Sequence, residues 1–137
     1  MNDLKYLFAY TVPLASFVSV MGEGMMTLTA PVYVFIFIPV LEMLLKDYDM
    51  HYTNDEKEKR RYNRFFDVLL YLNIPFVFLV LFFGFYQLFT NNYSSLEYFG
   101  IILSLGILLA TNAINVAHEL GHRTNTFDRS LAKLLLL

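Results

Sequence analysis

Long apolar segments are the feature of this 137-residue chain that most restricts its fold. Residues 68–89 form a run of 22 residues without a charged side chain, and residues 98–117 form a run of 20. Two further apolar segments, residues 4–20 and 27–45, hold one charged residue each. A helix needs about 20 apolar residues to cross the hydrocarbon core of a bilayer. We therefore expect an all-α integral membrane protein in which these four ranges are transmembrane helices.

The composition supports a lipid environment and excludes several other classes of protein. Apolar and aromatic residues make up 57% of the chain, which is more than so small a body can bury. No segment alternates apolar and polar residues as the wall of a membrane barrel does. The net charge of -2 gives no basic surface for nucleic acid, so no nucleic-acid partner is expected. Cysteine is absent, so any thiolate-ligated iron centre must belong to a partner.

The distribution of basic residues predicts the orientation of the chain. Residues 46–64 carry six of the ten Lys and Arg residues, and the remaining four are Lys5 and three residues that follow the fourth apolar segment. The joints at residues 21–26 and 90–95 have no basic residue. Four alternating crossings therefore place every basic residue on one side, which the positive-inside rule identifies as the cytoplasm. We expect a multi-pass membrane protein, with the N-terminus, the loop 46–64 and the end of the fourth segment in the cytoplasm.

A histidine motif, "NVAHELGHR", follows the fourth apolar segment. His118 and His122 are four residues apart, so a helix places both imidazoles on one face, where they can converge on a metal ion. Asn112 and Asn115 lie on the same stripe, and their amides are candidates to hydrogen-bond the imidazoles and fix their tautomers. The whole polar stripe consists of Thr111, Asn112, Asn115, His118, Glu119 and His122. Because polar groups at membrane depth are costly unless they face partners, we expect this stripe to point inward.

The spacing H-E-x-x-H does not by itself identify the metal. In a zinc peptidase, His118 and His122 would bind zinc with a third ligand from elsewhere, and Glu119 would activate the water. Alternatively, the two histidines cap the end of the helix without a metal, and the chain is a membrane anchor without catalytic function. The remaining histidine, His51, has no partner at ligand spacing and is expected to be a surface residue.

The motif and its surroundings resemble the N-terminal third or so of bacterial alkane 1-monooxygenases, which belong to the membrane fatty-acid-hydroxylase and desaturase superfamily. "NVAHELGHR" resembles the first histidine box of this family, and "DRSLAKLLL" resembles the helix that follows it. "FIFIPVLEMLLKDYD" and "RRYNRFFDVLLYLNIP" are similar to the second membrane helix and to the entry of the third. The resemblance implies that residues 1–137 are the N-terminal part of one larger transmembrane oxygenase domain, with the histidine box at 118–122.

The resemblance also implies a chemistry. It assigns His118 and His122 as ligands of a non-haem di-iron centre whose remaining ligands lie beyond residue 137, so the chain alone should be inactive. Glu119 receives an auxiliary role, such as proton handling. The implied reaction inserts one oxygen atom of O2 into a terminal C–H bond of a medium-chain n-alkane, with electrons from rubredoxin and its NAD(P)H-dependent reductase. Arg123 and the basic residues after it are expected to anchor the cytoplasmic side, and docking of an acidic electron carrier is the alternative.

Overall fold

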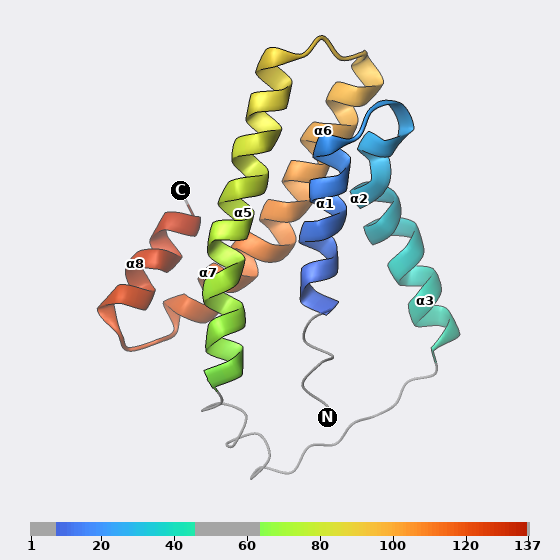
Figure 1. The fold of residues 1–137 in the computed structure, drawn as a ribbon. Helices are drawn as coiled ribbons and strands as arrows, with labels where there is room; N and C mark the ends of the chain where they lie inside the picture. Colours follow the sequence, from blue (N-terminus) through green and yellow to red (C-terminus); the bar gives the residue numbers. More distant parts are fainter. Residues whose placement is uncertain (1–7, 46–63, 137) are drawn as a thin grey trace.

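The computed structural model describes residues 8–45 and 64–136, which fold into helices joined by short turns (Figure 1). No strand occurs within these residues, so the predicted all-α class is confirmed. Most of the predicted cytoplasmic loop 46–64 lies outside the described residues, as does His51.

The helices form two hairpins and a C-terminal extension. The first hairpin joins α1 to a composite helix, and the second joins α5 to another composite helix that ends at the histidine motif. The bounds are α1 (Thr11–Met21), η2 (Gly24–Leu28), α2 (Thr29–Val32), η3 (Tyr33–Phe37), α3 (Ile38–Leu44), α5 (Arg64–Thr90), α6 (Ser95–Leu108), η4 (Leu109–Ala113), α7 (Ile114–Gly121) and α8 (Thr126–Leu135). η2 is a 3-10 helix, whereas η3 and η4 are π-helical turns.

Three helical segments are long and apolar enough to cross a membrane: Gly24–Leu44, Asp67–Thr90 and Ser95–Gly121. The chain is therefore a membrane protein with three candidate spans among the described residues. The first predicted range begins before the described residues, and its described part, Phe8–Met21, is a shorter apolar helix. The prediction of four spans is thus supported for three of them.

The four apolar segments alternate in direction. α1 begins, α3 ends, α5 begins and α7 ends at the same end of the bundle, at the bottom of Figure 1. At the opposite end, the backbone N–H of Gly24 in the first hairpin turn donates to Oε1 of Glu97 at 2.7 Å. Gly24 has a φ of 59°, a left-handed conformation that glycine adopts without strain. Ser94 caps α6 by accepting from the N–H of Glu97, whose side chain accepts in return from the N–H of Ser94.

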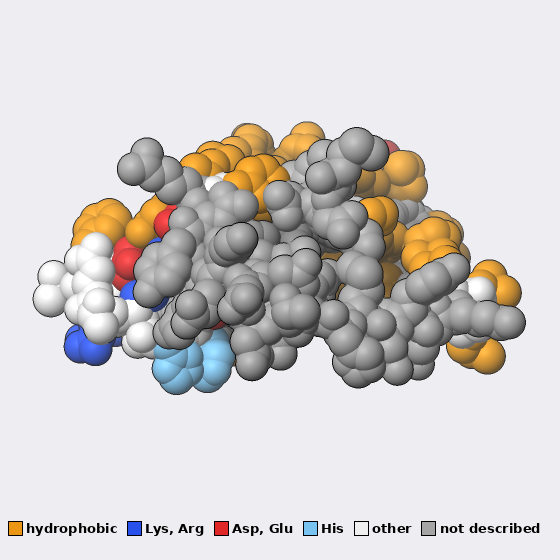
Figure 2. All heavy atoms as spheres, turned by 90° about the horizontal axis from the view of Figure 1, so that it is seen from below, with side chains coloured by type: hydrophobic (Ala, Val, Ile, Leu, Met, Phe, Trp, Pro, Cys, Tyr) orange, Lys and Arg blue, Asp and Glu red, His pale blue; other side chains and the backbone are white. Residues whose placement is uncertain are grey.

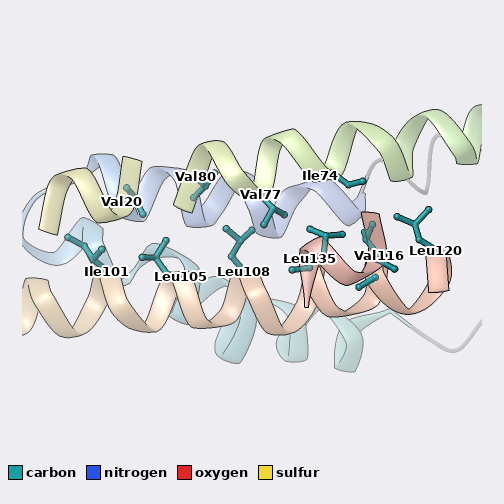
Figure 3. Packing of buried hydrophobic residues seen from close by; sticks show 13 residues of the cluster. Val20, Ile74, Val77, Val80, Ile101, Leu105, Leu108, Val116, Leu120 and Leu135 are labelled. Carbon is teal, nitrogen blue, oxygen red and sulfur yellow. The ribbon is translucent and has the colours of Figure 1, made fainter. Parts of the chain in front are cut away.

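The core lies between α5 and the composite helix of α6, η4 and α7 (Figure 3). Its largest fully buried apolar side chains are Val20, Val77, Val80, Ile101, Leu108 and Leu120. α8 folds back on α7 and adds Leu135 to this core. The core therefore connects α8 with both hairpins, including the helix that carries the histidines.

Small residues bring the first hairpin close to α6. The Oγ of Ser19 on α1 accepts from the N–H of Ala30 at 2.8 Å, and the Oγ of Ser104 on α6 donates to the carbonyl of Thr27. A Cβ atom built on Gly100 would lie 2.5 Å from Oγ1 of Thr27, so only glycine allows this approach. Helices in bilayers associate through such close packing and interhelical hydrogen bonds, because apolar burial gives little advantage over lipid.

Candidate metal-binding site

The π-helical turn η4 leads directly into the histidine helix α7. Within it, Oγ1 of Thr111 donates to the carbonyl of Ile107 at 2.7 Å and to Oδ1 of Asn112 at 3.0 Å. Nδ2 of Asn112 donates to the carbonyl of Ala9, at 3.3 Å, and so links η4 to the first helical segment. π-Turns inside membrane helices occur frequently at functional sites, and this one lies one turn before the histidine motif.

His118 and His122 lie next to each other at the end of α7. Their Nε2 atoms are 3.2 Å apart, and the two rings are almost perpendicular, at 88°. Both side chains are exposed in this chain. Figure 2 shows histidine side chains at the surface at this end of the bundle, close to basic and acidic side chains. The predicted convergence of the two imidazoles is therefore present in the structure.

The separation of the two nitrogen atoms can be compared with the geometry of a metal site. Two imidazole nitrogens bound to one ion at about 2.1 Å and separated by this distance enclose an angle of about 100° at the ion. That angle lies between the octahedral and tetrahedral values, so the pair fits as two adjacent ligands of one metal ion. Within residues 8–45 and 64–136, no cluster of three or more histidine, cysteine or carboxylate side chains forms a complete site. The described part of the chain thus offers two candidate ligands.

A cavity of about 620 Å³ lies beside α7, between α1 and α5. Glu119 and Asn115 line it, whereas His118 and His122 are not among the lining residues. The polar stripe predicted from the sequence is thus divided between the cavity and the surface that carries the imidazoles. The walls are mainly apolar and include Val12, Leu69, Leu70 and Val116.

The two asparagines of the stripe bond the backbone in this structure. Asn112 bonds the carbonyl of Ala9, and Nδ2 of Asn115 donates to the carbonyl of Thr111 at 2.6 Å. Among the described residues, neither amide hydrogen-bonds an imidazole. Support of the imidazoles by Asn112 and Asn115 stays a prediction.

Asn73 on α5 also lines the cavity, and sequence reasoning did not single it out. Its side chain is buried at 4% exposure, and its Oδ1 has no hydrogen-bond partner among the described residues. A buried polar atom without a partner is costly and commonly marks a functional site or a bound molecule. Asn73 lies inside the apolar run 68–89 and belongs to no motif, so no signal in the sequence could have identified it.

A network of charged residues follows the histidine pair. Arg123 forms an ion pair with Asp67 on α5 and a longer one with Asp128 on α8. Partial burial disfavours the charged form of Arg123, but the hydrogen bond to Asp67 and the charges of Asp67 and Asp128 outweigh it and raise its pKa above the usual value. Arg123 therefore stays cationic, and its charge is engaged within the protein.

The fold and the site together define a helical membrane protein that presents two converging imidazoles at the end of a span. No family model matches the chain. The chain is 33% identical to alkane 1-monooxygenase 1 of Alcanivorax borkumensis over 102 residues, which are 72% of this chain and 24% of that protein.

Two further relatives carry the same name. An alkane 1-monooxygenase of Pseudomonas putida is 32% identical over 99 residues, again 72% of this chain and 24% of the relative. An alkane 1-monooxygenase of Ectopseudomonas oleovorans is 43% identical over 79 residues, 58% of this chain and 19% of that relative. The resemblance to alkane 1-monooxygenases inferred from the histidine box is confirmed by these relatives, and the chain spans about a quarter of the length of the first two.

Proposed function

We propose that this chain supplies the first histidine motif of a membrane-bound alkane hydroxylase, which converts medium-chain n-alkanes into 1-alkanols. The observation that carries the proposal is the similarity to three alkane 1-monooxygenases in a chain whose two motif imidazoles converge to 3.2 Å. In the overall reaction, one atom of O2 enters the terminal C–H bond and the other leaves as water. The reaction consumes two electrons and two protons.

His118 and His122 are proposed to bind iron through their Nε2 atoms, with the remaining ligands of a di-iron centre supplied from outside the described residues. The iron, when bound, supplies the activation of O2. The exposed position of the pair suits a site that further segments of the protein complete. Each imidazole must bind in its neutral form, so binding of iron competes with protons at these nitrogens.

The cavity beside α7 suits an apolar substrate. Its volume of about 620 Å³ and the apolar part of its wall can accommodate a hydrocarbon chain. Glu119 is the carboxylate that lies on both the histidine helix and the cavity wall. We assign to Glu119 the handling of protons near the site rather than a role as iron ligand.

The partners and the location follow from the same proposal. Rubredoxin and its NAD(P)H-dependent reductase deliver the electrons, and the bilayer delivers the alkane. The histidine end of the bundle is proposed to face the cytoplasm of a bacterial inner membrane, because Arg123, Arg129 and Lys133 follow the histidine motif there. Arg129 and Lys133 on α8 are exposed and could contribute to anchoring or docking, although Nε of Arg129 also donates to the carbonyl of Arg123, whereas the charge of Arg123 is engaged with Asp67.

The relatives do not favour the zinc peptidase alternative. A peptidase of the H-E-x-x-H type needs the carboxylate of the motif beside the metal-bound water. Glu119 here lines a cavity that the two imidazoles do not line, and it has no hydrogen bond to either of them in the described part of the chain. This division supports the oxygenase.

The experiment that tests the function is hydroxylation of n-octane by the full-length gene product in membranes. Rubredoxin, its reductase, NADH and isotopically labelled O2 are supplied, and label is expected in 1-octanol. His118→Ala and His122→Ala should each abolish the product, whereas His51→Ala, the matched histidine control, should keep parental activity. Absence of labelled alcohol from the parent, or equal loss in the His51 control, would contradict the proposal.

A further inference from the structure

Arg123, the residue after the second histidine, connects the end of α7 to two other helices. Its Nη2 donates to Oδ1 of Asp67 on α5 at 2.5 Å, and its Nη1 lies 3.7 Å from Oδ2 of Asp128 on α8. The hydroxyl of Tyr71, one turn after Asp67 on α5, donates to the other oxygen of Asp128 at 2.6 Å. These four residues, which we call the clamp, close a ring of contacts between α5, the turn after α7, and α8.

Asp128 determines which position of α8 allows the clamp to form. Its side chain is 4% exposed, which is rare for a carboxylate. A charge buried to this extent is tolerated only when it is paired and hydrogen-bonded, and Arg123 and Tyr71 meet both needs. Asp128 also lies in the first turn of α8, where the helix dipole favours a negative charge. Any other placement of α8 would leave this carboxylate without its partners.

The turn between α7 and α8 is held by further contacts on both sides of Arg123. The carbonyl of Arg123 accepts from Nε of Arg129 at 2.9 Å, and its N–H donates to the carbonyl of Leu120. A Cβ built on Gly121 would lie 3.9 Å from the Cβ of Ala132, which is ordinary van der Waals distance, so the two helices are closely apposed there. The position of the last turn of α7 therefore depends on α8 and on the clamp.

The histidine pair has no other restraint of this kind. Within the described ranges, the hydrogen bond between the two Nε2 atoms is the only side-chain bond of His118 or His122. Both rings are exposed, so packing does not fix their rotamers. The backbone of the last turn of α7 sets the distance between the two Cβ atoms and so the region in which the imidazoles can meet, and the clamp holds this backbone in place.

We propose that Arg123 and Asp128 are positioning residues that hold the two imidazoles in the arrangement needed to share one metal ion. This inference rests on the proposed function, because the groups that are positioned are the proposed iron ligands. Neither residue is a proposed metal ligand; Arg123 lies on the wall of the cavity beside α7, whereas Asp128 does not line it. They act through α7, as residues behind metal ligands commonly do.

The decisive variant is the double substitution Arg123→Gln with Asp128→Asn in the full-length protein. Arg123→Gln alone leaves a buried carboxylate unpaired, and the loss of folding could then hide the effect on the histidines. The double variant removes both charges and keeps a polar side chain at each position. Lys133→Gln is the matched control, because Lys133 is an exposed cation on the same helix α8.

Two measurements separate this proposal from the proposed function. Hydrogen–deuterium exchange of the metal-free protein reports on the clamp directly, and we expect the amides of residues 118–123 to exchange about 10-fold faster in the double variant. Competitive titration with Co²⁺ as the probe reports on positioning, and we expect affinity to fall about 10- to 100-fold. Lys133→Gln should match the parent in both measurements.

Circular dichroism first establishes that the double variant is folded. Faster exchange together with weaker Co²⁺ binding supports the positioning role, whereas parental exchange or parental affinity overturns it. The exchange rate and the Co²⁺ affinity of Arg123→Lys should lie between those of the parent and the double variant. A lysine keeps the positive charge, but it lacks the planar guanidinium whose separate N–H groups contact Asp67 and Asp128. If the parent itself binds no metal, the proposed function fails, and the exchange measurement still decides whether the clamp holds α7.

Discussion

Gly100 on α6 is the position at which one methyl group should most disturb the helix packing. A Cβ atom there would lie 2.5 Å from Oγ1, 2.9 Å from Cβ and 3.0 Å from the carbonyl carbon of Thr27. Thr27 cannot simply rotate away, because its Oγ1 donates to the carbonyl of Gly24 and its own carbonyl accepts from Ser104. Gly100→Ala therefore forces α6 and η2 apart. Overpacking of this kind costs about 1–3 kcal/mol, and the better helix propensity of alanine returns about 1 kcal/mol at most.

Gly106 on the same helix is the matched control. Nothing lies within 4 Å of a Cβ built there, so Gly106→Ala should leave stability unchanged or raise it by up to about 1 kcal/mol. The free energies of unfolding of both variants, measured by titration with SDS in detergent micelles, should differ by about 1–3 kcal/mol, with Gly100→Ala the less stable. Equal stabilities, or a more stable Gly100→Ala, would refute the close approach of α6 to η2.

Three further predictions concern the core, the cap of α6 and the carboxylate of the motif. Leu108→Ala, at a fully buried position, should lower the free energy of unfolding by about 2–5 kcal/mol in the same titration, and Leu109→Ala, at 37% exposure, by clearly less. Ser94→Ala removes the N-cap of α6 and should lower the free energy of unfolding by about 1 kcal/mol. Ser95→Ala, at the first helical position, should change it by no more than a few tenths of a kcal/mol. Glu119→Gln should lower the rate of octanol formation only in part; complete loss together with retained iron would indicate an essential role instead.

The helical segments could be predicted from the sequence because each is apolar over nearly its full length. Residues 68–89 and 98–117 lie within the candidate spans Asp67–Thr90 and Ser95–Gly121. Their ends could not be placed as well, since they depend on local bonds such as the capping box of Ser94, which starts α6 earlier than predicted. The π-turn η4 could not be predicted, because the residues before it are apolar on nearly all sides and give no one-sided pattern in which an extra residue would show as a shift.

The histidine pair was predictable because its two members are four residues apart in one helix. The clamp was not, because Asp67 lies 56 residues before Arg123, and only the folded hairpin brings them together. Arg123 was interpreted as an anchoring or docking cation, and the structure shows its charge engaged with Asp67. The helix expected from "DRSLAKLLL" is present as α8, but no signal in the sequence indicated that Asp128 within it would be buried against α5.

The proposed role of His118 and His122 as ligands of a di-iron centre is tested most directly by metal analysis of the purified full-length protein. We expect about two irons per chain, a geometry typical of nitrogen and oxygen ligands, and loss of at least one iron in the His118→Ala, His122→Ala double variant. A single zinc ion per chain in the parent, or an unchanged iron content in the double variant, would contradict it.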